Sequence, residues 1–386
     1  MKAYQDASLA PARRAKALLE EMTLAEKVGQ LNQRLYGFRI YERKCVNGED
    51  TIELSEEFCQ EVEKYSGLGV LYGLYRADPW ADKDYETGLT GLLSKKAYNQ
   101  VQRYVLEHSR LGIPVMMSSE CPHGHQALDG YLLPVNLLAG ATFDPAMVRA
   151  AYRVSGRQLQ NMGVDLALMS MLDVLRDPRW GRSEECYSED PYLSARMAEA
   201  AVIGMQESGP EVVAKHFAAQ GEGTGGVNAS AARIGERELR EIHFPPAAAA
   251  IKAGVKGIMA AYNEIDGVYC HANHWLLNDV IRKEMGFDGI VMSDGVAIDQ
   301  LDSMTGDNVV SGALALQSGV DVGLWDEAFG KLEEAVRRGL VKEAQIDQAV
   351  LRVLTLKFER GLFEHPYLEE EGEIHMDYAQ NPESVQ

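Results

Sequence analysis

Charged and hydrogen-bonding side chains follow most of the apolar runs in this sequence, at the point where each run ends. These residues are Glu120, Asp173, Lys215, His216, Tyr262, Asn263, Asp294, Trp325 and Asp326. Carboxylates beside cations and aromatic rings can hold the hydroxyl groups of a sugar, and an ionised carboxylate can act as a nucleophile. If the apolar runs are strands of one sheet, these side chains form a polar floor ringed by aromatic residues. Such a surface is typical of a sugar-binding site.

Asp294 ends the apolar run in "GIVMSDGVAIDQL", residues 289–301. The plainer interpretation is a strand-to-helix turn, in which Asp294 caps the following helix and Gly295 supplies the bend. The alternative is that Asp294 is a catalytic carboxylate. The segment alone leaves both open.

Lys215 and His216 are adjacent and follow directly after "EVVA", so they project in different directions at the end of a run. An isolated Lys-His pair is more typical of a surface salt bridge or a helix cap. Beside the other polar run ends, a functional role is favoured. The next stretch, "AAQGEGTGGVN", predicts a long mobile loop over the site because its glycines exclude a regular element.

Metal chemistry is the main competing interpretation. His123 and His125 form one pair with ligand-like spacing, and His271 and His274 form another. Neither pair is accompanied by a matching Cys or His cluster, so the sequence predicts neither a metal site nor a cofactor.

Eight apolar runs alternate with helical patterns and must position these side chains. The runs start near Leu68, Pro114, Leu137, Asp165, Val212, Gly257, Gly289 and Val320. Continuous apolar strands alternating with helices predict a parallel sheet covered on both faces. Eight such units favour an α/β fold of the (β/α)8 barrel type, in which active sites lie at the carboxyl ends of the strands. The unit near 120–142 is irregular, because no convincing helix precedes Leu137.

Composition narrows the class of protein further. The chain has 386 residues, is 46% hydrophobic and carries a net charge of −20, which argues against nucleic acid or an anionic membrane as a partner. No apolar run is long enough to span a bilayer, and the amino terminus is charged where a signal peptide is apolar. Five scattered cysteines suggest no disulfide framework. We therefore expect a cytoplasmic protein.

Long motifs in this chain resemble those of glycoside hydrolase family 3, in that family's order. They are "DPRWGRSEECYSEDPYL" (177–193), "VVAKHF" (212–217), "GIMAAYNEIDG" (257–267) and "GIVMSDGVAI" (289–298). The segment "LGIPVMMSSECPHG" (111–124) resembles the family's strand that delivers an acidic residue three places before His-Gly. The similarity runs from about Thr23 to "FERGLF", nearly the whole chain.

The resemblance implies a (β/α)8 barrel and the activity of a retaining β-glycosidase. It implies that Asp294 is the nucleophile that forms a covalent glycosyl-enzyme, and that Tyr262 is the tyrosine beside it. The residues implied to hold the sugar's hydroxyl groups are Glu120, Arg182, Lys215 and His216. β-Glucosides are the first expectation for the substrate, because Glu120 suits a hexose whose outer hydroxyls need an acceptor.

The sequence departs from the family pattern in three places. Gly295 stands where the family usually has an aromatic residue after Ser-Asp, which bears on contacts with the leaving group. "AAQGEG" lacks the Pro-Gly-His-Gly of the N-acetylglucosaminidase branch, so that activity is not expected. In the glucosidase and xylosidase branches the acid/base comes from an α/β sandwich domain after the barrel, and this chain has no segment that resembles it.

Three hypotheses follow for the missing acid/base. It comes from a second chain carrying the sandwich domain or from a removed segment, it is a local acid with Glu222 as the nearest candidate, or the chain is a non-catalytic carbohydrate-binding or regulatory subunit. A homo-oligomer is also an expected assembly. The expected organisation is a helical segment over 1–22, the barrel over 23–363, and an acidic tail over 364–386 that resembles the linker to the sandwich domain.

Overall fold

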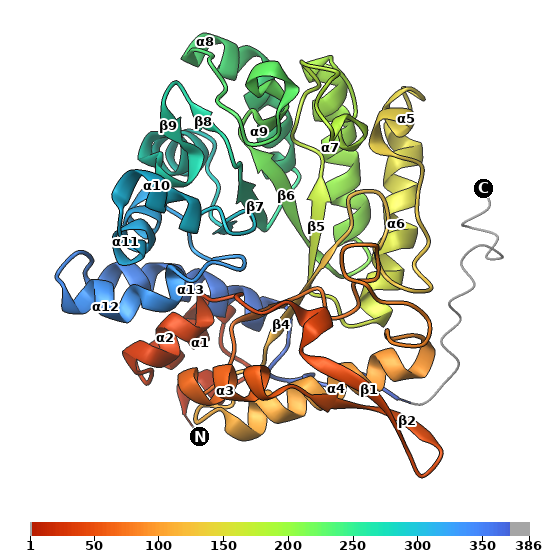
Figure 1. The fold of residues 1–386 in the computed structure, drawn as a ribbon, viewed down its shortest axis with the longest axis vertical. Helices are drawn as coiled ribbons and strands as arrows, with labels where there is room; N and C mark the ends of the chain where they lie inside the picture. Colours follow the sequence, from red (N-terminus) through yellow and green to blue (C-terminus); the bar gives the residue numbers. More distant parts are fainter. Residues whose placement is uncertain (1, 371–386) are drawn as a thin grey trace.

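The computed structural model describes residues 2–370, and Figure 1 shows its parallel strands surrounded by helices. Six strands form one parallel sheet in the order β10-β7-β6-β5-β4-β3. They are β3 (Val70–Tyr72), β4 (Met116–Glu120), β5 (Leu166–Ser170), β6 (Glu211–Phe217), β7 (Gly257–Ala260) and β10 (Ile290–Met292). All residues of β3, β5, β7 and β10 are buried, as expected for strands covered on both sides.

Two extended segments close this sheet into a barrel. The segment 320–325 lies beside β10, where Met292 and Val322 form a parallel bridge. The segment 31–36 lies beside β3, with a parallel bridge between Tyr36 and Tyr72. The two segments meet through hydrogen bonds from the Gly323 N–H to the Leu31 oxygen (2.9 Å) and from the Trp325 N–H to the Gln33 oxygen (2.9 Å). The predicted (β/α)8 barrel is therefore confirmed.

One of the eight predicted strands is wrong. The run at Leu137 lies in a short helix, α5 (Asn136–Gly140), and the missing strand position belongs to 31–36 instead. The physical reason is that 31–36 follows directly after α2 (Leu24–Gln30) and includes Asn32, Gln33 and Arg34. A segment with so many polar residues gives no apolar run to recognise. The irregular unit near 120–142 supplies β4, a loop and α5.

Helices follow the strands and cover the barrel. They are α3 (Glu56–Tyr65), α4 (Gly91–His108), α6 (Pro145–Asn161), α7 (Pro191–Gln206), α8 (Glu236–Glu238), α9 (Phe244–Lys252), a π-helical segment (Trp275–Glu284), α10 (Asp302–Thr305), α11 (Asn308–Ser318), α12 (Leu332–Arg337) and α13 (Glu343–Glu359). A capping box begins α2, because the side chains of Thr23 and Glu26 each accept from the other residue's backbone N–H. The Asp144 carboxylate caps α6, with Pro145 as its first residue.

Two small antiparallel pairs complete the described elements. β1 (Tyr41–Val46) and β2 (Glu49–Leu54) form a hairpin between the first barrel segment and α3. β8 (Glu264–Ile265) and β9 (Val268–Tyr269) form another directly after β7, at the carboxyl end of the strands. Because of this position, β8 lies close to the candidate site described below.

The beginning and the end of the described chain pack together. Helix α1 (Pro11–Leu19) lies against α13, and the Arg14 side chain bonds to the Tyr4 oxygen and to Glu364. The domain boundaries predicted at 23 and 363 stay predictions, and residues 371–386 of the predicted tail lie outside the described residues.

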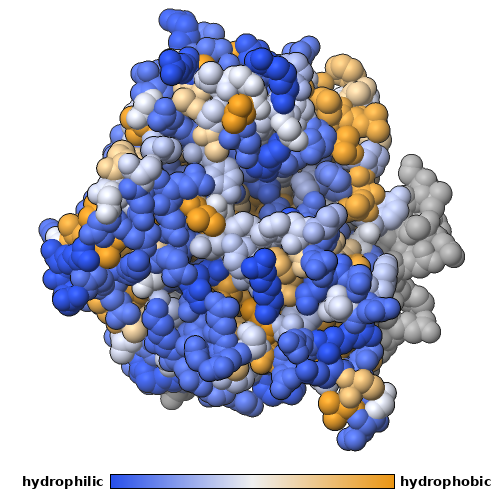
Figure 2. All heavy atoms as spheres, viewed as in Figure 1, coloured by the Kyte–Doolittle hydropathy of each residue, from blue (hydrophilic) through white to orange (hydrophobic). Residues whose placement is uncertain are grey.

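The face shown in Figure 2 is mostly hydrophilic, as a net charge of −20 leads one to expect. Among residues 2–370, no helix combines the length and the apolar character needed to cross a bilayer. Five free cysteines are present, and three of them are buried.

Candidate active site

Asp294 lies directly after β10 and is almost completely buried. Its backbone N–H donates to Nε2 of His271 (3.1 Å), and its Oδ1 accepts the Gly295 N–H (2.8 Å). Its Oδ2 is buried and has no hydrogen-bond partner. A buried carboxylate oxygen without a partner is costly, so this position carries a group that the fold alone does not satisfy.

Asp326 fastens the turn that carries Asp294. Its Oδ2 accepts from the Ser293 hydroxyl (2.6 Å) and the Leu324 N–H (3.1 Å), and its Oδ1 accepts from the Ile298 N–H (2.8 Å). Burial raises the pKa of Asp326 to about 7. Both oxygens are occupied by fixed donors of the turn, so Asp326 positions Asp294 and is not available to a substrate.

His216 and Arg182 face Asp294 from β6 and from the loop after β5. Nε2 of His216 lies 3.5 Å from Oδ2 of Asp294 and 3.0 Å from an Arg182 nitrogen, and its Nδ1 lies 2.7 Å from Oδ2 of Asp173. Because a guanidinium only donates, Nε2 accepts and the proton sits on Nδ1, which donates to Asp173. The polar end of β5 thus orients the ring of His216.

Glu185 holds the Arg182 side chain in place. Nε and a terminal nitrogen of Arg182 donate to the two oxygens of Glu185, at 2.6 and 2.8 Å. Burial alone would raise the pKa of Glu185, but the hydrogen bonds and charge of Arg182 outweigh it and hold that pKa far below its usual value. Two parallel bonds of this kind fix a guanidinium in orientation as well as position.

Glu120 and Lys215 form a second charged pair at the ends of β4 and β6. The Lys215 ammonium donates to Oε2 of Glu120 (2.6 Å), and the Tyr72 hydroxyl donates to Oε1 (3.1 Å). Arg76 approaches the same oxygen at 3.8 Å. Burial would raise the pKa of Glu120, but Lys215 and Arg76 outweigh it and lower that pKa. Lys215 and His216 point to different partners, as their adjacency predicted.

Tyr262 follows β7 and closes the ring of polar groups beside Asp294. Its hydroxyl donates to the Gly295 oxygen (2.8 Å), and burial together with the charge of Asp294 raises its pKa. Its backbone N–H donates to the side chain of Gln220 (3.2 Å). Gln220 lies near the start of the glycine-rich segment and is buried, so this part of the expected mobile loop packs into the wall of the site.

Glu222, the candidate local acid, points elsewhere. Its Oε2 lies 3.4 Å from Arg176 and 3.5 Å from Nε2 of His243. Both groups lower its pKa, with His243 the larger cause. Within residues 2–370 it makes no hydrogen bond or ion pair with Asp294, Arg182 or His216. The structure therefore brings the other predicted site residues together and leaves Glu222 outside their network.

Three of the four histidines considered as metal ligands have other partners. Nε2 of His125 is bonded to the Ser119 hydroxyl (2.8 Å), His271 supports Asp294, and His274 lies at hydrogen-bond distance from the Gln317 oxygen. No group of three or more His, Cys, Asp or Glu side chains within the described part of the chain has the arrangement of a metal site.

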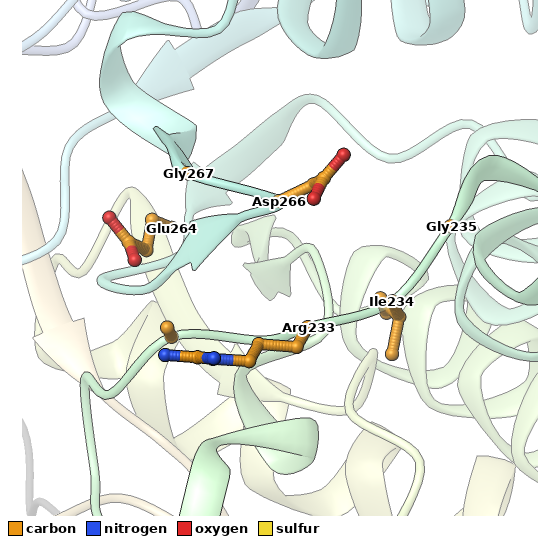
Figure 3. A pocket seen from close by; sticks show the side chains of 7 residues that line it. Arg233, Ile234, Gly235, Glu264, Asp266 and Gly267 are labelled. Carbon is orange, nitrogen blue, oxygen red and sulfur yellow. The ribbon is translucent and has the colours of Figure 1, made fainter.

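A cavity of about 460 Å³ lies on the rim of the site, two residues beyond Tyr262. Figure 3 shows it between β8 and the loop that precedes α8, with the side chains of Arg233 and Glu264 reaching it from these two segments. The N–H of Ala232 donates to the Glu264 oxygen (2.8 Å), which fixes the loop against β8. The rim beside β7 is thus polar and open.

Sequence reasoning did not assign a supporting role in the site to four residues. They are Tyr72, Arg76, Glu185 and His271. Tyr72 was within reach, because it is the last residue of β3 and the same strand-end rule applies to it. The other three lie in a loop (Arg76) or in short 3-10 helices (Glu185 and His271), and only the fold brings them to the groups that they support.

The comparisons with known proteins agree with this geometry. The profile of the Glycosyl hydrolase family 3 N terminal domain matches residues 23–356. A putative beta-xylosidase of Formosa agariphila is 33% identical over 95% of this chain and 48% of its own length. A β-glucosidase structure from Erythrobacter marinus superimposes with a TM-score of 0.83 at 32% identity, covering 96% of this chain and 48% of that one.

A third relative carries a bound sugar. The structure of a mutant β-glucosidase from Listeria innocua in complex with laminaribiose superimposes with a TM-score of 0.78 at 30% identity, covering 92% of this chain and 47% of that one. The chain spans about half the length of the relatives that it matches.

Proposed function

The chain belongs to glycoside hydrolase family 3, and from that membership we propose that it is the barrel half of a retaining β-glycosidase with Asp294 as nucleophile. The observation that carries the proposal is Oδ2 of Asp294, a buried carboxylate oxygen without a partner that faces His216. The substrate class follows from the ring of donors and acceptors around it, which suits sugar hydroxyls.

The chemistry proceeds in two steps. Oδ2 of Asp294 attacks the anomeric carbon, and the bond to the leaving-group oxygen breaks with its electron pair on that oxygen, which then takes a proton. Water next attacks the anomeric carbon of the glycosyl-enzyme, loses a proton to the acid/base and releases Asp294. Arg182 and His216 hold the sugar beside Asp294, while Glu120 and Lys215 hold the hydroxyl groups farther from the broken bond.

The acid/base comes from outside this chain in our proposal. Among the described carboxylates around Asp294, Glu120, Asp173 and Glu185 are each engaged by a cation or by His216. Glu222 is paired with His243 and Arg176, which favours its ionised form and makes it a poor proton donor. A second chain or segment that carries a carboxyl group to the open face of the site would complete the pair.

β-Glucosides are the proposed substrates. The support is the hydroxyl-binding pair of Glu120 and Lys215, together with a relative that binds laminaribiose. A cytoplasmic location and assembly with a second chain or a second copy also stay proposals.

The test is covalent trapping with the 2,4-dinitrophenyl 2-deoxy-2-fluoro-β-glucoside, whose leaving group departs without a proton. We expect a stoichiometric mass increase of one glycosyl unit, mapped to the peptide that contains Asp294. The Asp294→Asn variant is the matched control and should stay unlabelled. A label on another carboxylate would reassign the nucleophile.

The alternative is a carbohydrate-binding or regulatory subunit without turnover. It is favoured by the pairing of the nearby carboxylates with cations or with His216, which leaves none of them as a proton donor. This alternative predicts that glucose binds while no residue becomes labelled, even after prolonged incubation. The same trapping experiment, run beside calorimetric titration with glucose, separates the two functions.

A further inference from the structure

Exposed apolar side chains are concentrated between β4 and β5, on α5 and the start of α6. Among residues 2–370, fourteen large apolar side chains are exposed, and five of them fall within 16 residues. These five are Leu132, Leu137, Leu138, Phe143 and Met147. Figure 2 shows hydrophobic residues gathered over α5 and the adjoining part of α6, at the upper right of the view. Apolar side chains clustered in this way mark a surface that binds another protein.

A groove runs through this cluster. A cavity of about 680 Å³ lies between the segment 131–142 and the first turns of α6. Leu133, Leu138, Met147 and Val148 line it, together with the side chain of Arg153. The cavity has room for an aromatic side chain of a partner. We call residues 130–154, which include the groove, the α5–α6 surface.

Buried hydrogen bonds fix both walls of the groove. The Asn136 side chain of α5 donates to the backbone oxygens of Ser170 (2.6 Å) and Glu185 (2.9 Å). The Gln158 side chain of α6 donates to the Asp129 oxygen (2.8 Å). The α5–α6 surface therefore has its shape before a partner arrives, which reduces the ordering cost of binding.

The α5–α6 surface carries one carboxylate and one guanidinium that are open to a partner. Asp144 is the only acidic residue between 130 and 154, in a chain that has 58 acidic residues. Its Oδ1 accepts from the N–H groups of Ala146 (3.0 Å) and Met147 (3.1 Å), which leaves Oδ2 exposed to solvent. Arg153 is exposed, and its side chain makes no hydrogen bond or ion pair within residues 2–370. It lies nine residues beyond Asp144, about 13 Å along the helix.

We propose that the α5–α6 surface binds the same surface of a second copy of this chain, in a two-fold symmetric dimer. In such a dimer each contact occurs twice, with the roles of the two copies exchanged. Phe143, which is 74% exposed, enters the cavity of the other copy, and the adjacent Asp144 meets the Arg153 that lines that cavity. The protruding ring, the groove and both charges occur on one surface, so a second copy satisfies all of them at once. This inference does not depend on the proposed function.

The net charge of −20 favours this surface over any other for self-association. Two copies of so acidic a chain repel each other, and repulsion is strongest between carboxylates brought close together. Charges farther apart than about 8 Å are largely screened at physiological salt. Because Asp144 is the single acidic residue of the α5–α6 surface and faces an arginine, two copies meet there with little repulsion.

Sedimentation equilibrium of the full chain at increasing micromolar concentrations tests the inference. We expect the mass to rise from 42.6 kDa toward twice that value. Phe143→Asp should raise the dimer dissociation constant at least a hundredfold, because each copy loses the inserted ring and gains a carboxylate. Arg153→Glu should raise it at least tenfold. Adding Asp144→Lys to Arg153→Glu should recover most of that loss, since the facing charges are again opposite.

Tyr85→Asp is the matched control, because Tyr85 is 64% exposed and lies beside the β1–β2 hairpin, where its backbone oxygen accepts from Arg43 (2.8 Å). This variant should change the dissociation constant less than twofold, and far-UV circular dichroism should show that all variants fold. A mass of 42.6 kDa at every concentration would assign the surface to a different polypeptide and overturn the proposal. A dimer whose dissociation constant is unchanged in Phe143→Asp would also overturn it, because its interface would lie elsewhere.

Discussion

The two ends of the barrel treat buried charge in opposite ways. At the amino ends of the strands, the Lys357 ammonium donates to Gln30 (2.6 Å) and to the Pro114 (2.7 Å) and Leu68 (3.3 Å) backbone oxygens. Asp321 accepts from Arg282, Arg352 and the Val291 N–H, each within 2.8 Å. At the carboxyl ends, Oδ2 of Asp294 has no hydrogen-bond partner.

This difference separates charges that build the fold from charges kept for chemistry. Lys357 and Asp321 bond to backbone groups at the starts of strands, so they hold neighbouring strands in position. Asp294 is held by hydrogen bonds of its backbone N–H and of its Oδ1, which leaves Oδ2 free to react. In this kind of barrel, residues at the amino ends of the strands usually support stability, and residues at the carboxyl ends usually support function.

Replacing Asp294 should give the largest change in activity and almost none in stability. For Asp294→Asn we expect hydrolysis of 2,4-dinitrophenyl β-glucoside to slow by about 10⁴-fold or more, because the nucleophile is lost. The free energy of unfolding should stay equal or rise, since an unpaired buried charge disappears. Initial rates and denaturant titration measure the two effects. A large fall in the free energy of unfolding would show that Asp294 also stabilises the fold, as Lys357 does at the other end of the barrel.

Replacing Lys357 should give the reverse pattern. Burial lowers the pKa of Lys357 to about 7, yet its three acceptors match the three hydrogens of the ammonium. Lys357→Met leaves those acceptors buried and unpaired, so we expect the free energy of unfolding to fall by about 3 kcal/mol. Glucose affinity should change less than twofold. Lys256→Met, which removes a half-exposed lysine paired with Glu359 (3.0 Å), is the control and should cost under about 0.5 kcal/mol.

Acid should lower the free energy of unfolding through the protonation of His271 at the carboxyl end of the barrel. Burial lowers the pKa of His271 to about 3, below the ordinary value of about 6.5, so below pH 6.5 the unfolded chain binds more protons than the folded one. The stability contribution is complete above pH 6.5 and declines as pH falls toward 3. By pH 4 the loss should reach about 3 kcal/mol.

The measurement is the free energy of unfolding between pH 7 and 4. His271→Gln should remove most of this slope, because an amide oxygen can still accept the Asp294 N–H without titrating. His274→Gln, at a more exposed histidine three residues on, should keep it. An unchanged slope in His271→Gln would show that other groups cause the acid loss.

A methyl group at residue 295 should disturb the site through the ring of Trp325, which packs against Gly295. In Gly295→Ala the new Cβ collides with Trp325 at 2.4 Å, and overpacking of this kind costs about 2 kcal/mol. Gly235→Ala is the control, because no atom lies within 4 Å of its Cβ position. In a Trp325→Leu background the cost of Gly295→Ala should fall close to zero, which a double-mutant cycle measures. An equal cost of Gly295→Ala in both backgrounds would show that the cost does not come from contact with Trp325.

The sequence predicted the polar residues at the strand ends better than the rest of the molecule. Asp294, Lys215 and Glu120 end apolar strands, and parallel strands bring their carboxyl ends to one edge, so a local pattern was enough to group them. The first barrel segment was missed because Asn32 and Gln33 interrupt any apolar run.

The contacts among three aromatic residues at the same end of the barrel could not be predicted, for a different reason. Tyr36, Trp80 and Trp325 are separated by 44 and 245 residues, and only closure of the barrel between its first and last segments brings them together. The role of Glu185 was hidden in the same way, since its partner Arg182 lies in a loop whose path no periodicity describes.

Replacing Glu222 should change the reaction at Asp294 least, because Glu222 lies outside the network of the site. Its carboxylate is paired with Arg176 and His243, and it has no contact with Asp294. For Glu222→Gln we expect trapping of the fluoroglycoside at Asp294 to proceed within twofold of the parent rate. Glu238→Gln, which removes the other carboxylate near Arg176 (3.8 Å), is the matched control. If Glu222→Gln slows an alkyl glucoside and spares the dinitrophenyl glucoside, Glu222 is the proton donor, and the acid/base lies within this chain after all.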